Sequence, residues 1–138
     1  MRLVADANVL LSAVLGGRAG DVLKHSEVHE VLTAEAAFAE VQEYAVLLAR
    51  KRGVSVDAVL LTVAASPVLM VERTVYARAL PRARKLIAER DPDDVDTLAL
   101  ALHSELPVWS NDNDFEDTSV EWYTTAELLH KLESFKER

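Results

Sequence analysis

The chain has 138 residues, enough for one domain with a single core and too few for a second folded unit, so residues 1–138 are expected to form one domain. Half of the residues are hydrophobic, 28% are charged, and Gly and Pro number four each, which excludes disordered and collagen-like chains. Cysteine is absent, which excludes disulfides and thiolate chemistry. The net charge of −8 argues against a polybasic nucleic-acid binder, but it does not exclude a nucleic acid that binds through metal ions.

Short apolar runs alternate with helices in the first half of the chain. The run 3–5 predicts a strand that ends at Asp6, and Asn8 is expected to cap a helix that ends near residue 15. The elements expected next are a helix over 19–25, a strand over 30–32, a helix from Thr33 to about 52 ended by Gly53, a helix capped by Ser55 to about 65, and a strand over 68–71. The N-terminus has the pattern of neither a signal peptide nor a membrane span, so we expect a soluble, cytoplasmic protein with no membrane contact.

The second half of the chain continues the alternation. A helix is expected over 74–90, and Pro81 should divide it into two pieces. Asp91 as cap and Pro92 at the first helical position predict the start of a helix that runs to about 104. Strands over 107–109 and 120–123 then flank a polar loop, and a capping box of Thr124 and Glu127 opens the last helix. Five strands separated by helices predict a parallel α/β sheet covered on both faces.

Two acids in the first half have positions that are unusual for surface acids. Asp6 follows the first strand, where open α/β sheets form their ligand crevice, although a turn or cap residue is an equal alternative. Glu40 borders an apolar helical stripe formed by Ala37, Val41, Tyr44 and Leu48, which predicts a semi-buried carboxylate. The simpler interpretation of Glu40 is a boundary glutamate whose stem packs while its carboxylate reaches water.

Further acids of this kind lie in the second half. Asp94 shares a helix face with apolar residues while Asp96 lies nearly opposite, and stabilisation of the helix N-terminus is the alternative role of Asp94. Asp112 and Asp114 follow a strand directly, in a loop that fails as an EF-hand because Asp117 occupies the position of the required Gly. Phe115 is expected to anchor this loop in the core rather than stack on a base.

Four segments of the sequence resemble, in order and spacing, the acidic motifs of PIN domains. They are Asp6–Ala13, Glu40-Val41, Asp91–Asp94 with the apolar helix that follows, and Trp109–Phe115, so the resemblance spans nearly the whole chain. It implies a PIN-like three-layer α/β/α fold with a doubly wound, five-stranded parallel sheet of order 3-2-1-4-5. It also implies metal-dependent cleavage of RNA by a ribonuclease.

The resemblance assigns roles to individual residues of this chain. Asp6, Glu40, Asp94 and Asp112 would be the catalytic acids and metal ligands, with Asp114 as an auxiliary ligand. Asn8 and Ser110 would order the site, although helix capping is the simplest role of Asn8. One or two Mg²⁺ ions held by these acids would activate a water molecule and neutralise the scissile phosphate.

The charge and chemistry of the candidate acids indicate which cation they would bind. Four carboxylates brought together repel one another unless cations join them or protons neutralise them. Oxygen ligands alone favour Mg²⁺, with Mn²⁺ as the natural substitute, and the four histidines form no zinc motif.

The sequence also suggests partners. RNA contacts are expected at Arg78, Arg82, Arg84 and Lys85, which concentrate positive charge on one segment. Similarity to VapC-like toxins implies a partner antitoxin and a homodimer. The alternative is a catalytically inactive PIN-like module or a receiver-like regulatory module, although a receiver needs paired acids near the first strand and a Lys after the last, where this chain has Thr124 and Thr125.

Overall fold

A five-stranded parallel sheet of order β3-β2-β1-β4-β5 forms the centre of the computed structural model, which describes residues 1–136. The strands are β1 (Arg2–Ala5), β2 (Glu30–Ala34), β3 (Leu69–Val71), β4 (Val108–Trp109) and β5 (Trp122–Tyr123). In register, Val4 of β1 lies opposite Leu32 on one side and Val108 on the other. The predicted α/β class and strand order are confirmed, and a receiver-like order of 2-1-3-4-5 is excluded.

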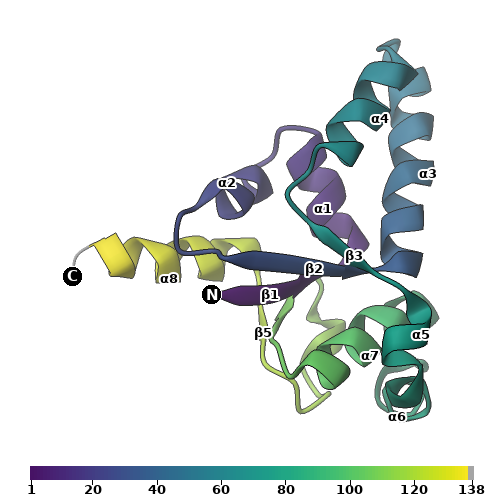
Figure 1. Cartoon of the computed structure of the whole chain (residues 1–138), viewed down its shortest axis with the longest axis vertical. Coiled ribbons are helices and arrows are strands. Elements are labelled where there is room, and N and C mark those ends of the chain that lie inside the picture. The colour runs from purple at the N-terminus through teal and green to yellow at the C-terminus, as the bar shows by residue number, and fades with distance from the viewer. Residues whose placement is uncertain (137–138) are drawn as a thin grey trace.

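Helices cover both faces of the sheet and make three layers (Figure 1). One layer holds α1 (Ala7–Val14), α2 (Ala19–Lys24), α3 (Glu35–Arg52), α4 (Val56–Ala64) and α8 (Thr125–Lys136), and the other holds α5 (Arg73–Tyr76), α6 (Leu80–Ile87) and α7 (Val95–Ser104). The short strands are mostly apolar because alternate side chains enter different cores: Val4 packs with the α5–α7 side, whereas Leu3 and Ala5 pack with the α1–α4 side.

The helix from the second strand begins later and packs differently than the sequence predicts. Thr33 does not cap it: Thr33 is fully buried in β2, its hydroxyl donates to the Ala5 carbonyl oxygen at 3.2 Å, and α3 begins after Ala34. The buried stripe keeps Ala37 and Val41 but then continues through Ala45 and Ala49, because small residues at every fourth position let the helix approach its neighbours closely. Tyr44, expected in the stripe, is 49% exposed.

The predicted helix ends agree better with the structure. Gly53 ends α3 in the left-handed conformation at φ 67°, and Ser55 caps α4 by accepting from the Ala58 backbone N–H. The chain breaks before Pro81 through a 3₁₀ turn (Ala77–Ala79), which gives the two expected pieces. None of the helices in the described part combines the length and hydropathy needed to cross a bilayer.

Candidate metal centre

Asp6 occupies the turn between β1 and α1 at the carboxyl end of the sheet. Its carboxylate Oδ1 accepts from the Val9 backbone N–H at 3.0 Å, so Asp6 rather than Asn8 caps α1. Asn8 stands in the first helical turn with an exposed side chain, which corrects its predicted capping role. Burial raises the pKa of Asp6, which is 3% exposed, while hydrogen bonds from Ser110 and Val9 oppose that shift.

Successive local hydrogen bonds between backbone N–H groups and side-chain oxygens hold the loop after β4 in place. The Asp112 backbone N–H donates to the buried Ser110 hydroxyl at 3.0 Å, and the Asp114 backbone N–H donates to Asp112 Oδ1 at 3.1 Å. Phe115 is fully buried, as expected of an anchor. Partial burial raises the pKa of Asp114, and the neighbouring Asp112 charge raises it further. The loop therefore fixes Asp112 and Asp114 next to each other.

The turn before α7 contributes two more carboxylates. Asp91 caps a 3₁₀ turn (Pro92–Asp94), and its side chain accepts from the Asp93 backbone N–H at 2.9 Å. Asp94 Oδ2 is buried and has no hydrogen-bond partner within residues 1–136. Burial, and then the charges of Asp91, Asp6 and other acids, raise the pKa of Asp94 from 3.8 to about 8.

Asp96, on the other side of α7, has structural partners. Asp96 Oδ2 accepts from the Tyr76 hydroxyl at 2.6 Å and lies 3.4 Å from Arg73 Nε. Burial and this hydrogen bond raise the pKa of Tyr76. Asp93 is exposed. Of the three acids between 93 and 96, Asp94 is therefore the one that joins the other carboxylates.

Four carboxylates converge where the loop after β4 meets the turn before α7. One oxygen from each of Asp91, Asp94, Asp112 and Asp114 lies within 4.8 Å of the others, and we call these four residues the acidic cluster. Sequence reasoning missed Asp91 because helix capping accounted for it. The available signal was spacing, since residues i and i+3 of a 3₁₀ turn lie on the same side and so bring Asp91 beside Asp94.

Asp6 and Glu40 border the acidic cluster without belonging to it. The charge of Asp6 contributes to the raised pKa values of Asp94 and Glu40, which places all three in one electrostatic neighbourhood. Glu40 is half-buried on α3, and burial, followed by the charges of Asp93 and Asp91, raises its pKa. The structure thus brings the predicted acids to one edge of the sheet in two groups.

The donor set of the acidic cluster fits a hard divalent cation. All four candidate donors are carboxylate oxygens, which suit Mg²⁺ or Mn²⁺ better than zinc, since zinc sites usually include His or Cys. The buried oxygen of Asp94 has no protein donor to satisfy it, and a cation would supply the missing partner. Bringing these charges together without a cation costs free energy, which the raised pKa values express.

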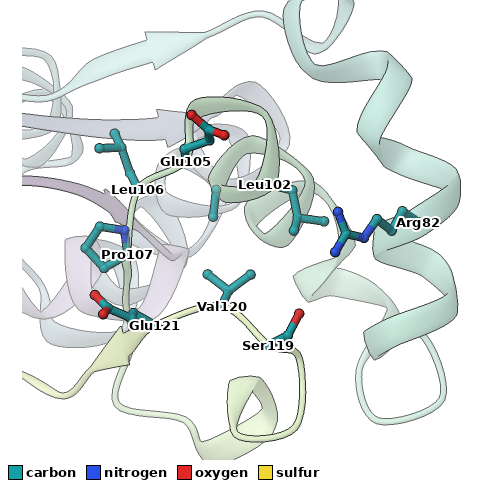
Figure 2. A pocket seen from close by; sticks show the side chains of 9 residues that line it. Arg82, Leu102, Glu105, Leu106, Pro107, Ser119, Val120 and Glu121 are labelled. Atoms are coloured by element: carbon teal, nitrogen blue, oxygen red, sulfur yellow. The ribbon is translucent and has the colours of Figure 1, made fainter.

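The basic residues expected to contact RNA are exposed, and none of them is a member of the acidic cluster. Arg82 lines a cavity of about 300 Å³ beside Pro107, at the amino end of β4 and hence at the opposite edge of the sheet from Asp112 (Figure 2). Arg90 lies nearer, since its Nη1 donates to the backbone carbonyl of Asp114 at 3.4 Å. RNA contacts at Arg78, Arg82, Arg84 and Lys85 stay predictions.

Comparisons with known proteins agree with this geometry. A model of the PIN domain family matches residues 4–133, whereas no curated protein matches the chain in sequence. A toxin–antitoxin complex from Klebsiella pneumoniae has a similar fold, with a TM-score of 0.65, 17% identity and coverage of 89% of this chain and 97% of that one.

Two further solved structures share the fold. VapBC2 from Rickettsia felis, bound to a promoter DNA fragment, has a TM-score of 0.67 and 12% identity, and the match covers 90% of this chain and 98% of that one. VapC20 from Mycobacterium tuberculosis, a toxin that cleaves the sarcin-ricin loop, has a TM-score of 0.58 and 19% identity, with 86% and 95% covered.

Proposed function

The chain belongs to the PIN domain family, and from this premise we propose that it is a Mg²⁺-dependent ribonuclease that hydrolyses phosphodiester bonds within RNA. The observation that carries the proposal is the acidic cluster, in which four carboxylates meet and the buried Asp94 oxygen has no protein partner. Mn²⁺ is expected to substitute for Mg²⁺ because it accepts the same oxygen ligands.

The residues in and around the acidic cluster would have two different roles in hydrolysis, cation binding and proton acceptance. Asp94, Asp112 and Asp114 would hold the cation, and Asp91, which lies with them, joins this set. A divalent cation supplies neutralisation of the phosphate charge and makes a water molecule more acidic. Glu40, half-buried and with a raised pKa, is suited to take the proton of the attacking water on its carboxylate.

Contacts with neighbouring residues fix the position of the Asp6 carboxylate. Its carboxylate is held by the Val9 N–H and bordered by Ser110, so it cannot turn away from the neighbouring acids. Ser110 accepts from the Asp112 backbone and in this way orders both acids, while Asn8 contributes its backbone N–H to Asp6. These contacts support the site-ordering roles that the sequence suggests for Asn8 and Ser110.

RNA hydrolysis by the purified protein tests the proposal. A labelled single-stranded RNA is incubated with the parent protein in Mg²⁺, in Mn²⁺ and in EDTA, and with the Asp94→Asn variant. Asp117→Asn is the matched control, because its side chain is 85% exposed and lies 3.7 Å from Arg90 Nη1, outside the acidic cluster. We expect cleavage by the parent and the control in Mg²⁺, and none in EDTA or by Asp94→Asn.

Failure of that assay has a definite meaning. If the parent protein leaves RNA intact in Mg²⁺ and calorimetry detects no Mg²⁺ binding, the ribonuclease proposal is wrong. The chain would then be an inactive PIN-like interaction module, the alternative raised by the sequence. Mg²⁺ binding without cleavage would also reject the ribonuclease and keep only the metal centre.

We also propose that the protein is the toxin of a toxin–antitoxin pair and that it works in the cytoplasm. Residues 1–138 would form a single domain, and two copies of the chain would form a homodimer. The support for the toxin proposal is the fold shared with the toxin–antitoxin complex from Klebsiella pneumoniae and with VapBC2 from Rickettsia felis. Induced expression in a bacterial host is expected to arrest growth, and Asp94→Asn should relieve the arrest. Equal growth with both proteins, or a monomer by light scattering, would contradict the toxin or dimer proposal respectively.

A further inference from the structure

Two neighbouring hollows lie where α1, α2 and α8 meet on one face of the sheet. The first, of about 260 Å³, is lined by Ser12, Arg18, Ala19, Asn111, Thr125 and Ala126. The second, of about 380 Å³, is lined by Arg18, Asp21, Lys24, His25, Leu129 and Glu133. Arg18 lines both hollows, so they adjoin, and we call the two together the α2–α8 groove.

The α2–α8 groove begins beside the acidic cluster. Asn111 lines its first hollow and is followed directly by Asp112, a member of the cluster. The Thr125 backbone N–H donates to Asn111 Oδ1 at 2.8 Å, which identifies the side-chain oxygen and leaves the Asn111 amide NH₂ without a partner among residues 1–136. A polar group bound at Asn111 would therefore lie one residue from the proposed site of hydrolysis.

Arg18 reaches the groove through a tight turn. Gly16 has a φ of 88°, and a Cβ atom on Gly17 would lie 2.4 Å from Ser12 Oγ and 3.0 Å from the Ser12 carbonyl oxygen, so both positions favour glycine. The turn holds Arg18 against α1 next to Ser12. Arg18 is exposed, and its guanidinium makes no ion pair or hydrogen bond with any residue from 1 to 136.

The first hollow offers donors and no acid. The Arg18 guanidinium, the Asn111 amide and the Ser12 hydroxyl line it, and no Asp or Glu does. Guanidinium groups pair with phosphate oxygens through parallel hydrogen bonds, and neutral donors complete such a site. In a chain of net charge −8, an unpaired arginine that shares a hollow with Asn111, the residue before Asp112, favours an anion that has to approach the acidic cluster.

The second hollow is more mixed in charge. Lys24 and His25 add positive or donor groups, while Asp21 and Glu133 add negative ones. His25 Nδ1 accepts from the Glu27 backbone N–H at 3.1 Å, so Nε2 carries the proton of the neutral ring, and this N–H finds no acceptor within the described residues. The first hollow should therefore bind phosphate more strongly than the second.

We propose that the α2–α8 groove binds the RNA strand next to the cleaved bond, with one phosphodiester held by Arg18, Asn111 and Ser12 in the first hollow. The strand continues past Arg18 toward Lys24. This inference rests on the proposed ribonuclease function and assigns its substrate path to the α2–α8 side of the molecule. It differs from the path expected from the sequence, which ran along Arg78 to Lys85 and includes Arg82 at the opposite sheet edge.

Binding and cleavage by arginine variants test the groove. Binding of a labelled single-stranded oligoribonucleotide is measured by fluorescence anisotropy in Mg²⁺ at several KCl concentrations, with Asp112→Asn in every protein to prevent cleavage. Cleavage is measured without that background change. The variants are Arg18→Gln, the matched control Arg2→Gln, whose arginine pairs with Glu30 at 2.8 Å, and Arg82→Gln for the rival surface.

We expect Arg18→Gln to weaken RNA binding about tenfold and to lower the slope of log affinity against log salt by about 0.7, the value for one phosphate contact on a single strand. KM should rise while kcat stays within about twofold of the parent value, because Arg18 does not touch the reacting bond. Arg2→Gln should match the parent in binding, salt slope and cleavage.

Two results would overturn the proposal in distinguishable ways. If the parent cleaves RNA in Mg²⁺ but Arg18→Gln binds with the parental affinity and salt slope, or Arg82→Gln alone weakens binding, the groove is wrong and the ribonuclease stands. If the parent neither binds nor cleaves RNA, the proposed function is wrong and the groove with it.

Discussion

Replacing Asp94 by Asn should stabilise the metal-free protein at alkaline pH while abolishing cleavage. In the folded protein, burial and neighbouring acids raise the pKa of Asp94 from 3.8 to about 8, and one of its oxygens has no hydrogen-bond partner in the described chain. Between these two pH values the folded state holds a proton that the unfolded state has released. The free energy of unfolding of the parent therefore falls as pH rises from about 4 to about 8.

The size of this effect follows from the shift. A shift of about four pKa units corresponds to about 5 to 6 kcal/mol if the site were fully shielded, at 1.36 kcal/mol per unit. Asp94 is only half-buried, and solvent screening reduces the value to about 2 kcal/mol. An Asn side chain has nearly the same shape and does not titrate, so Asp94→Asn should lack this loss of stability.

Urea denaturation in EDTA at pH 4 and pH 8.5 measures the difference. We expect the parent and Asp94→Asn to agree within about 0.5 kcal/mol at pH 4, and the variant to be more stable by about 2 kcal/mol at pH 8.5. Some pH dependence should remain, because Asp6, Glu40 and Asp114 also have raised pKa values. Parallel pH profiles for the two proteins would refute the reasoning, and Asp117→Asn should follow the parent.

Three more changes have defined outcomes. Mg²⁺ at ten times its dissociation constant should raise the free energy of unfolding by about 1.4 kcal/mol in thermal denaturation at constant ionic strength, and the same stabilisation of an Asp94→Asn protein would contradict the metal assignment. Asp6→Asn and Asp6→Ala should both cut the cleavage rate about a hundredfold. Only Asp6→Ala should lower the free energy of unfolding in urea, by about 1 kcal/mol, because Asn still caps α1. Parental cleavage by Asp6→Asn would count against the assignment. Phe115→Ala should destabilise the fold by about 3 to 4 kcal/mol, and a loss below about 1 kcal/mol would show that the loop is anchored elsewhere.

Much of the fold could be predicted because its signals are local. Gly53 ends a helix, the reciprocal hydrogen bonds of Thr124 and Glu127 at 3.1 Å open the last one, and Pro81 divides another, each through the backbone chemistry of one or two residues. The prediction that Thr33 caps a helix is wrong because pairing of β2 with β3 extends the strand through Thr33 and Ala34.

The candidate site could be predicted less completely, because it depends on contacts between distant segments. Asp6 and Asp112 follow from position alone, since the parallel strands that precede them end at one edge of the sheet. Asp91 does not, because its helix-capping bond to Asp93 explains it locally and only the fold brings it to Asp112 and Asp114. Arg18 had no sequence signal, since its place beside Asn111 depends on how α2 packs against α8.

The double duty of Asp6 has a consequence for how this site changes over evolutionary time. The same carboxylate begins α1 and faces the other acids, so selection for a well-formed helix acts on this position even when selection for cleavage ends. If the proposed nuclease function holds, a descendant without that activity should therefore drift to Asn, Ser or Thr at this position, which still cap a helix, before it accepts an apolar residue. Glu40 and Asp114, which cap none of the helices described within residues 1–136, are free of that constraint and should diverge first.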